Sequence, residues 1–100
     1  MKKTFNLIHE KIAKPRLVES AKHDVKKYLK RERNKALPKG FDVWEFDCKF
    51  GSSQDKAADV EVQDINKNIT EYEALDATEF YIEIIARAAL KSDRQIKFSS

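Results

Sequence analysis

The chain opens with a short stretch in which apolar and polar positions alternate. Between Lys2 and Ile8, the side chains of Phe5 and Leu7 fall on one side of an extended backbone. A period of two places alternate side chains on opposite faces of a strand. The pattern therefore predicts a first strand with one buried face.

The longest periodic pattern follows Pro15, a residue that suits the first turn of a helix because that turn leaves its N–H groups unpaired. The pattern ends before Pro38 and Gly40, which disfavour and terminate helices. It therefore predicts a helix from Pro15 to about Ala36, with one core-facing stripe. The stripe consists of Leu17, Val18, Ala21, Val25, Tyr28, Leu29 and Ala36.

Glu32 falls near the middle of this apolar stripe. A buried charge without a partner is costly. We therefore expect the last turn of the helix to overhang the edge of the core, where the Glu32 carboxylate meets water or a basic neighbour.

The second half of the chain alternates again. From Phe41 to Phe50, the side chains of Trp44, Phe46, Cys48 and Phe50 share one face, which predicts a half-buried strand. The turn-rich segment GSSQDK follows, and residues 57–63 then alternate in a way that favours a hairpin with this strand.

After the hairpin, the pattern predicts one more helix and one more strand. Asp64 is a helix-capping residue, and it precedes a short helix whose apolar side holds Ile65, Ile69 and Tyr72, with Leu75 at its end. The segment Glu79–Ala88 is rich in β-branched and aromatic residues and predicts the last strand.

This order of elements indicates an α+β two-layer sandwich of the ferredoxin-like type, β-α-β-β-α-β, with two helices on one face of an antiparallel sheet. The alternation within the strands agrees, because a sheet covered on both faces shows continuous apolar runs. The alternative depends on residues 57–63. If they begin the second helix, the fold is a three-stranded β-α-β-α-β unit.

Composition agrees with one soluble domain. A chain of 100 residues with 41% hydrophobic residues is long enough to bury one core, and we assign residues 1–90 to the domain and residues 91–100 to a loosely ordered tail. The chain shows no signal-peptide core and no apolar run long enough to span a membrane. With Cys48 as its single cysteine, an internal disulfide is impossible, so we expect a cytoplasmic location.

The net charge of +3 conceals an uneven distribution. Residues 11–40 carry eleven Lys or Arg against three acidic residues, whereas residues 41–90 carry four against twelve. The first segment therefore has a balance of +8 and the second a balance of −8. Such a molecule attracts opposite charge through one region and repels it through another.

Four segments resemble a known family: MKKTFNL, KPRLVESAKHDVKKYLKRER, LPKGFDVWEFDCKFG and EFYIEIIARA. They are similar to a family of small bacterial proteins of about this length, known as a domain of unknown function. The resemblance implies a bacterial cytoplasmic protein. It supplies no functional residues, because the family has no established activity.

The basic helix is the first candidate site. Its cations could follow nucleic-acid phosphates, most plausibly those of RNA or a ribonucleoprotein, with little sequence preference. The alternative is that this helix face is only solvated. Against it, acidic residues are sparse here, and arginines that can form bidentate contacts with phosphate occur among the lysines. The candidate residues are Arg16, Lys22, Lys26, Lys27, Lys30, Arg31, Arg33 and Lys35.

The predicted outer face of the sheet is acidic, and this argues against stacking of bases on it. In a hairpin, Glu45 and Asp47 would lie near Asp59 and Glu61, and like charges across a strand pair need compensation. A metal ion is less economical than a basic partner, and we predict no metal site. The same helix suggests another function, a protein-interaction module that self-associates or docks an acidic protein through its basic helix.

The sequence gives no sign of catalysis or of a cofactor. Cys48 lies between Phe46 and Phe50, where a free thiol behaves as a small apolar side chain. His9 and His23 belong to no recognisable triad or metal pair. We therefore expect a binding protein and not an enzyme.

Overall fold

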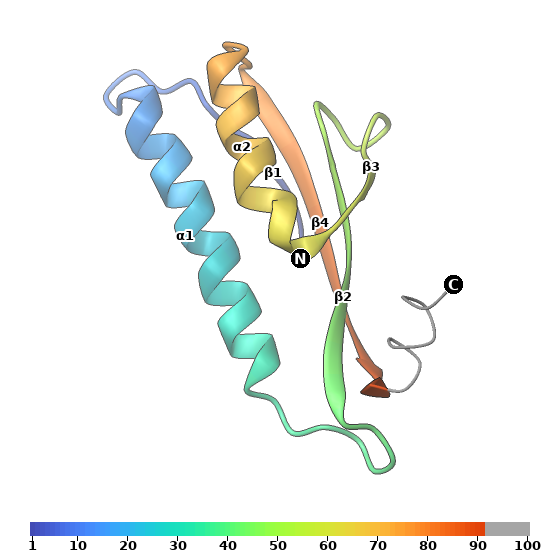
Figure 1. Cartoon of the computed structure of the whole chain (residues 1–100). Helices are drawn as coiled ribbons and strands as arrows, with labels where there is room; N and C mark the ends of the chain where they lie inside the picture. The colour runs from blue at the N-terminus through green and yellow to red at the C-terminus, as the bar shows by residue number, and fades with distance from the viewer. Residues whose placement is uncertain (92–100) are drawn as a thin grey trace.

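The computed structural model describes residues 1–91 of the chain. These residues form four strands, two α-helices and one turn of 3-10 helix, which Figure 1 shows in chain order. The elements are β1 (Lys2–Asn6), α1 (Lys14–Arg33), β2 (Val43–Gly51), β3 (Ala58–Val60), η1 (Val62–Asp64), α2 (Ile65–Ala74) and β4 (Glu79–Ala89).

The four strands form one antiparallel sheet in the order β1-β4-β2-β3. The expected α+β class, with one antiparallel sheet and two helices in the order β-α-β-β-α-β, is confirmed. The ferredoxin-like strand order is not, because β4 and β2 occupy the centre of this sheet. The three-stranded alternative is wrong, because Ala58–Val60 pairs with Cys48–Phe50.

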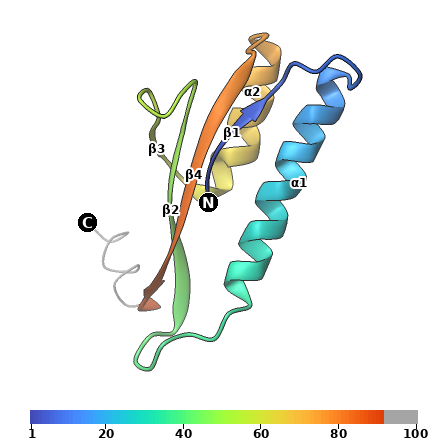
Figure 2. The ribbon, with the colours of Figure 1, turned by 180° about the vertical axis from the view of Figure 1, so that it is seen from behind.

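Both helices lie on the same side of the sheet, as Figures 1 and 2 show from opposite directions. The core fills the space between the helices and the inner face of the sheet. Its fully buried large side chains are Ile65, Ile69, Phe80, Ile82 and Ile84. Phe5 and Leu7 are buried as the first alternation predicted.

Helix α1 begins as expected, with Pro15 in its first turn, but it ends at Arg33 and not near Ala36. After Arg33 the backbone makes contacts outside the helix. The carbonyl oxygen of Lys35 accepts a hydrogen bond from the indole N–H of Trp44, at 3.0 Å. The segment after α1 is therefore in contact with β2.

The β2–β3 hairpin turns through residues 52–57 and is tight at Gly51. A Cβ atom placed on Gly51 would lie 2.6 Å from the Cα of Ala57, so only glycine allows this approach. Strand β3 is shorter than the sequence pattern suggested, since Val62 begins the 3-10 turn η1. Residues 57–63 therefore contain both a short strand and the start of the helical segment.

Three finer expectations near α2 and the end of the chain have different outcomes. Asp64 precedes α2 but its side chain makes no capping hydrogen bond, and Leu75 is 76% exposed and lies outside the core. The expected tail lies outside the described residues except for Lys91, whose backbone N–H donates to Asp42 Oδ1 at 2.9 Å.

Candidate functional site

Helix α1 carries the predicted cationic residues along its whole length. Its buried face consists of Val18, Ala21, Val25 and Leu29, so the side chains on its other positions face neighbouring elements or solvent. Lys30, Arg31 and Arg33 lie in its last turn, where cations interact favourably with the negative end of the helix dipole. The cations of the last turn therefore stabilise the helix and also contribute to its charged surface.

Two of the eight candidate cations hold the fold together. The Lys22 ammonium donates a hydrogen bond to Thr70 Oγ1 at 2.7 Å, which links α1 to α2. The Arg33 guanidinium carbon lies 5.2 Å from the centroid of the Phe46 ring, which links the end of α1 to β2. We therefore remove Lys22 and Arg33 from the ligand-contacting group.

Two further candidates surround Glu32. This residue is only 8% exposed, so the expectation that its turn overhangs the edge of the core was wrong. It has the expected basic neighbour, because the Lys35 Nζ atom lies 2.7 Å from Glu32 Oε2 and the Arg31 Nε atom lies 3.8 Å from it. The Lys35 contact is an ion pair, since Oε2 accepts no hydrogen bond of good geometry from the described residues.

The side chains of Arg31 and Lys35 nevertheless remain 69% and 57% exposed. The remaining candidates, Arg16, Lys26, Lys27 and Lys30, are exposed residues whose charged groups form no hydrogen bond or ion pair within residues 1–91. The structure thus divides the predicted group of eight. Six cations remain available on the solvent side of α1 and in the turn after it.

The outer face of the sheet contains its own compensating cation. The Arg87 Nε donates to Asp47 Oδ2 at 3.1 Å, and its Nη2 lies 3.4 Å from Glu45 Oε2. These contacts, chiefly the hydrogen bond to Asp47, raise the pKa of Arg87. The repulsion expected between carboxylates is therefore offset by β4, and Asp59 lies opposite Lys49 in the strand register. No group of three or more metal-ligating side chains with metal-site geometry occurs in the described part of the chain.

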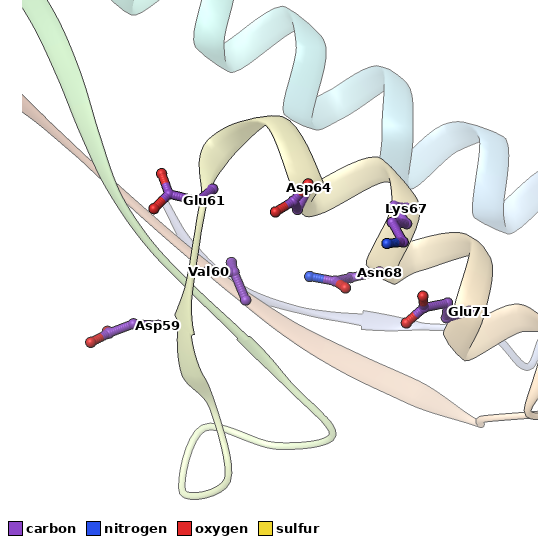
Figure 3. A pocket seen from close by; sticks show the side chains of 7 residues that line it. All are labelled: Asp59, Val60, Glu61, Asp64, Lys67, Asn68 and Glu71. Carbon is purple, nitrogen blue, oxygen red and sulfur yellow. The ribbon is translucent and has the colours of Figure 1, made fainter. Parts of the chain in front are cut away.

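An acidic hollow of about 490 Å³ lies between β3 and α2. Figure 3 shows that its side chains come from β3, the η1 turn and the first part of α2, and that Asp59 points away from the α2 side chains. Among the described residues, four carboxylates and one ammonium group line it. Its lining residues are Asp59, Val60, Glu61, Asp64, Lys67, Asn68 and Glu71.

A second hollow, of about 600 Å³, lies beside the first half of β2. Trp44 and Phe46 were expected in the core, but both are only half-buried, unlike Phe50. The reason is the length of α2. Ten helical residues span about 15 Å and nine strand residues about 30 Å, so α2 covers only part of β2. A comparison of the lengths of the second helix and the second strand could have indicated this hollow from the sequence.

The nucleophile candidates are poorly placed for chemistry. Cys48 is 4% exposed, and burial raises the pKa of its thiol to about 11, with the Asp47 carboxylate adding to the shift. His9 accepts hydrogen bonds at Nδ1 from the backbone N–H groups of Lys11 and Ile12, at 2.9 and 3.1 Å, and so shapes a turn. His23 is exposed on α1.

Comparison with known proteins places the chain in a family. The model of a family of unknown function, DUF6172, matches residues 1–95. The chain belongs to this family. The resemblance inferred from the four sequence segments is thereby confirmed. No curated protein and no solved structure matches this DUF6172 chain.

The membership in DUF6172 names no activity, so the functional argument depends on the surfaces described above. Neither helix within residues 1–91 combines the length and apolar character that a membrane span requires.

Proposed function

We propose that this protein is a cytoplasmic binding module whose helix α1 contacts nucleic-acid phosphates, most plausibly in RNA or a ribonucleoprotein, with little sequence preference. The observation that carries the proposal is the set of exposed cations on α1 that have no partner within residues 1–91. They are Arg16, Lys26, Lys27 and Lys30, and Arg31 and Lys35 extend the surface while contacting Glu32.

The distribution of acidic groups supports contact through this helix. Of the three acidic residues in α1, Glu32 is buried and Asp24 forms an ion pair with Lys3 at 3.6 Å, which leaves Glu19 as the exposed acid without such a pair among the described residues. A phosphate backbone approaching from the helix side therefore meets mostly positive charge. Binding by phosphate neutralisation releases counterions and weakens steeply with salt.

The opposite face of the molecule supports contact with the backbone rather than with the bases. The outer surface of the sheet presents Glu45, Asp47 and Asp59. Single-stranded RNA is usually read by stacking its bases on aromatic side chains. Trp44 and Phe46 are half-buried on the inner face of the sheet, where the Lys35 carbonyl and the Arg33 guanidinium already contact them. We therefore propose a binding role without base recognition and without catalysis.

The test is a titration of the nuclease-treated protein with a generic single-stranded RNA and a generic DNA duplex across a salt series. The change Lys26→Glu, Lys27→Glu and Lys30→Glu removes three cations without touching the core. The wild-type protein should bind both nucleic acids, and the slope of log affinity against log salt should become shallower by about three in the triple variant. Affinity without salt dependence would contradict phosphate contact.

The matched control makes the same change in charge elsewhere, through Lys11→Glu, Lys56→Glu and Lys67→Glu, all at exposed positions. This control should retain most of the affinity, and an equal loss in both variants would overturn the assignment to α1. A complex that forms without nucleic acid, is abolished by salt and is lost in the α1 variant would instead establish the alternative function. Light scattering at low and high salt detects this self-association directly.

A further inference from the structure

Within the described residues, strand β2 has no neighbouring strand along one edge of about half of its length. It pairs with β4 from Val43 to Gly51, but β3 pairs only with Cys48–Phe50. After β3 the chain turns away into η1. Within residues 1–91, no strand therefore lies along the outer edge of the segment from Val43 to Asp47. Exposed edges of this kind are templates for an added strand.

The hydrogen-bond pattern shows which backbone groups point toward this edge. The Ile84 N–H donates to the Met1 carbonyl at 2.7 Å, and the Ile84 carbonyl accepts from the Met1 ammonium at 2.7 Å, so Ile84 faces β1. Its neighbours in β4 then face β2, because backbone groups alternate along an antiparallel strand. In the register of β2 with β4, the same alternation turns the N–H and C=O groups of Trp44 and Phe46 toward the free edge.

The 600 Å³ hollow lies directly beside these backbone groups. Its apolar walls are formed by Leu37, Trp44, Phe46 and Val62. The walls are held in place, because the Trp44 indole N–H donates to the Lys35 carbonyl and the Arg33 guanidinium lies over the Phe46 ring. Side chains of an added strand that point inward would therefore enter a preformed groove whose walls are partly apolar.

The charges around this groove are mainly negative. Among the described residues that line it, Asp42 and Glu61 are acidic and Arg33 is the cation. Glu45 also lines it, but its carboxylate is already paired with Arg87. Glu61 also lines the acidic hollow between β3 and α2, together with three more carboxylates and Lys67 (Figure 3). An extended ligand along the edge therefore passes from one acidic region to another, which favours Lys or Arg in that ligand.

We propose that the free edge of β2 binds an extended segment of a partner protein in which apolar residues alternate with Lys or Arg, as an added strand. This binding site lies along β2, touches α1 at Arg33, and goes beyond the proposed nucleic-acid contact. A second copy of the chain fits less well. The same edge of a second copy carries Glu45 and Asp47 and has no Lys or Arg between Val43 and Asp47, so it lacks the cations that the acidic groove favours.

The probe is a synthetic peptide of about ten residues in which valine alternates with lysine. Trp44, the single tryptophan of the chain, reports binding through its fluorescence. We expect saturable binding, a change in Trp44 emission, and slower amide hydrogen exchange at Trp44 and Phe46. A peptide N-methylated on the backbone groups that face β2 should bind at least about tenfold more weakly, because the added strand needs those N–H groups.

Two peptide controls separate strand addition from nonspecific attraction. A peptide of the same composition with its valines and lysines in two blocks should bind at least about tenfold more weakly, as should a peptide with glutamate in place of lysine. Equal affinity of the alternating and block peptides would overturn the proposal. Protection of the Trp44 and Phe46 amides before any peptide is added would also overturn it, because the edge would then be covered.

The protein control is a pair of matched variants. Glu61→Lys changes the charge of the groove, whereas Asp55→Lys makes the same change in the exposed β2–β3 turn. The first should weaken peptide binding about tenfold and the second should leave it unchanged. The Lys26, Lys27 and Lys30 variant should still bind the peptide, so failure of one proposal is distinguishable from failure of the other.

Discussion

The most informative residues are those whose surroundings in the fold differ from the surroundings that the sequence pattern predicts. Glu32 lies in an apolar stripe, and its burial is compensated by Lys35. Its carboxylate also acts on its neighbours. Burial, and then the field of Glu32, raises the pKa of Tyr28. The phenol oxygen of Tyr28 in turn accepts a hydrogen bond from the Met1 ammonium at 3.1 Å. A stretch that appears apolar therefore contains a small electrostatic cluster that joins α1 to the N-terminus, just before β1.

Cys48 provides a prediction at the scale of one residue. The pKa of its thiol is about 11, compared with 9.0 for an unburied thiol. At a pH below both values, the folded protein therefore holds about a hundredfold less thiolate than the unfolded chain. Alkylation by iodoacetamide should be slower than in urea-unfolded protein by at least that factor. Similar rates in the two states would contradict the burial of Cys48.

The same shift predicts a pH dependence of stability. As the pH rises from 9.0 toward 11, the unfolded thiol loses its proton first, so the free energy of unfolding should fall over that interval. Urea unfolding measures this slope. Cys48→Ala should show a shallower decline, although Tyr28 and Tyr81, whose pKa values are also raised, still contribute at the upper end.

At the scale of elements, the lengths of helices and strands decide which surfaces are covered. Helix α1, with 20 residues, spans about 30 Å and matches β2 in length, but α2 is about half as long. The second half of β2 pairs with β3 and holds the buried Cys48 and Phe50. Within residues 1–91, the first half of β2 has an open edge and half-buried aromatic residues. The length difference therefore creates the groove.

The β2–β3 hairpin supplies a prediction at this scale. Gly51→Ala should lower the free energy of unfolding by about 1–3 kcal/mol, because the new Cβ meets the Ala57 backbone at 2.6 Å and the strands must separate. Chemical denaturation measures the loss. Gly40→Ala is a useful comparison, since Gly40 has space for a Cβ but a φ of 92°, so its cost comes from backbone strain alone. An unaltered stability of Gly51→Ala would show that the hairpin is looser than described.

At the scale of the whole molecule, charge and core are arranged independently. Most cations of residues 11–40 lie on α1 and the turn after it, and the acidic residues of residues 41–90 are spread over the sheet, its turns and α2. Helix α1, helix α2 and three strands meet in one cluster of buried residues, which includes Phe5, Val25, Ile69 and Phe80. Surface charge can therefore be changed without disturbing the common core.

Ile69 tests the cooperativity of that core. Its side chain is 0% exposed on α2, so Ile69→Ala should cost about 2–5 kcal/mol through lost burial and a cavity. Small domains usually unfold in one step. We therefore expect far-UV circular dichroism and Trp44 fluorescence to shift together by the same amount. Separate transitions would show that the part of β2 near Trp44 unfolds independently. Leu75→Ala, at an exposed position, is the control with little expected effect.

The amino-acid sequence by itself determined the type and order of the elements, because periods of two and of about 3.6 record which side of each element meets the core. It also determined the uneven charge and the family resemblance. It did not determine the strand order β1-β4-β2-β3, since alternation specifies a buried face but not a neighbouring strand.

Only the tertiary structure decided which charges are available. Lys22 and Arg33 resemble Lys26 and Lys30 in the sequence, yet Thr70 and Phe46 engage the first two. In the same way, Arg87 meets Glu45 and Asp47 only because β4 lies beside β2. These partners are distant along the chain, and a local pattern carries no information about contacts between distant residues.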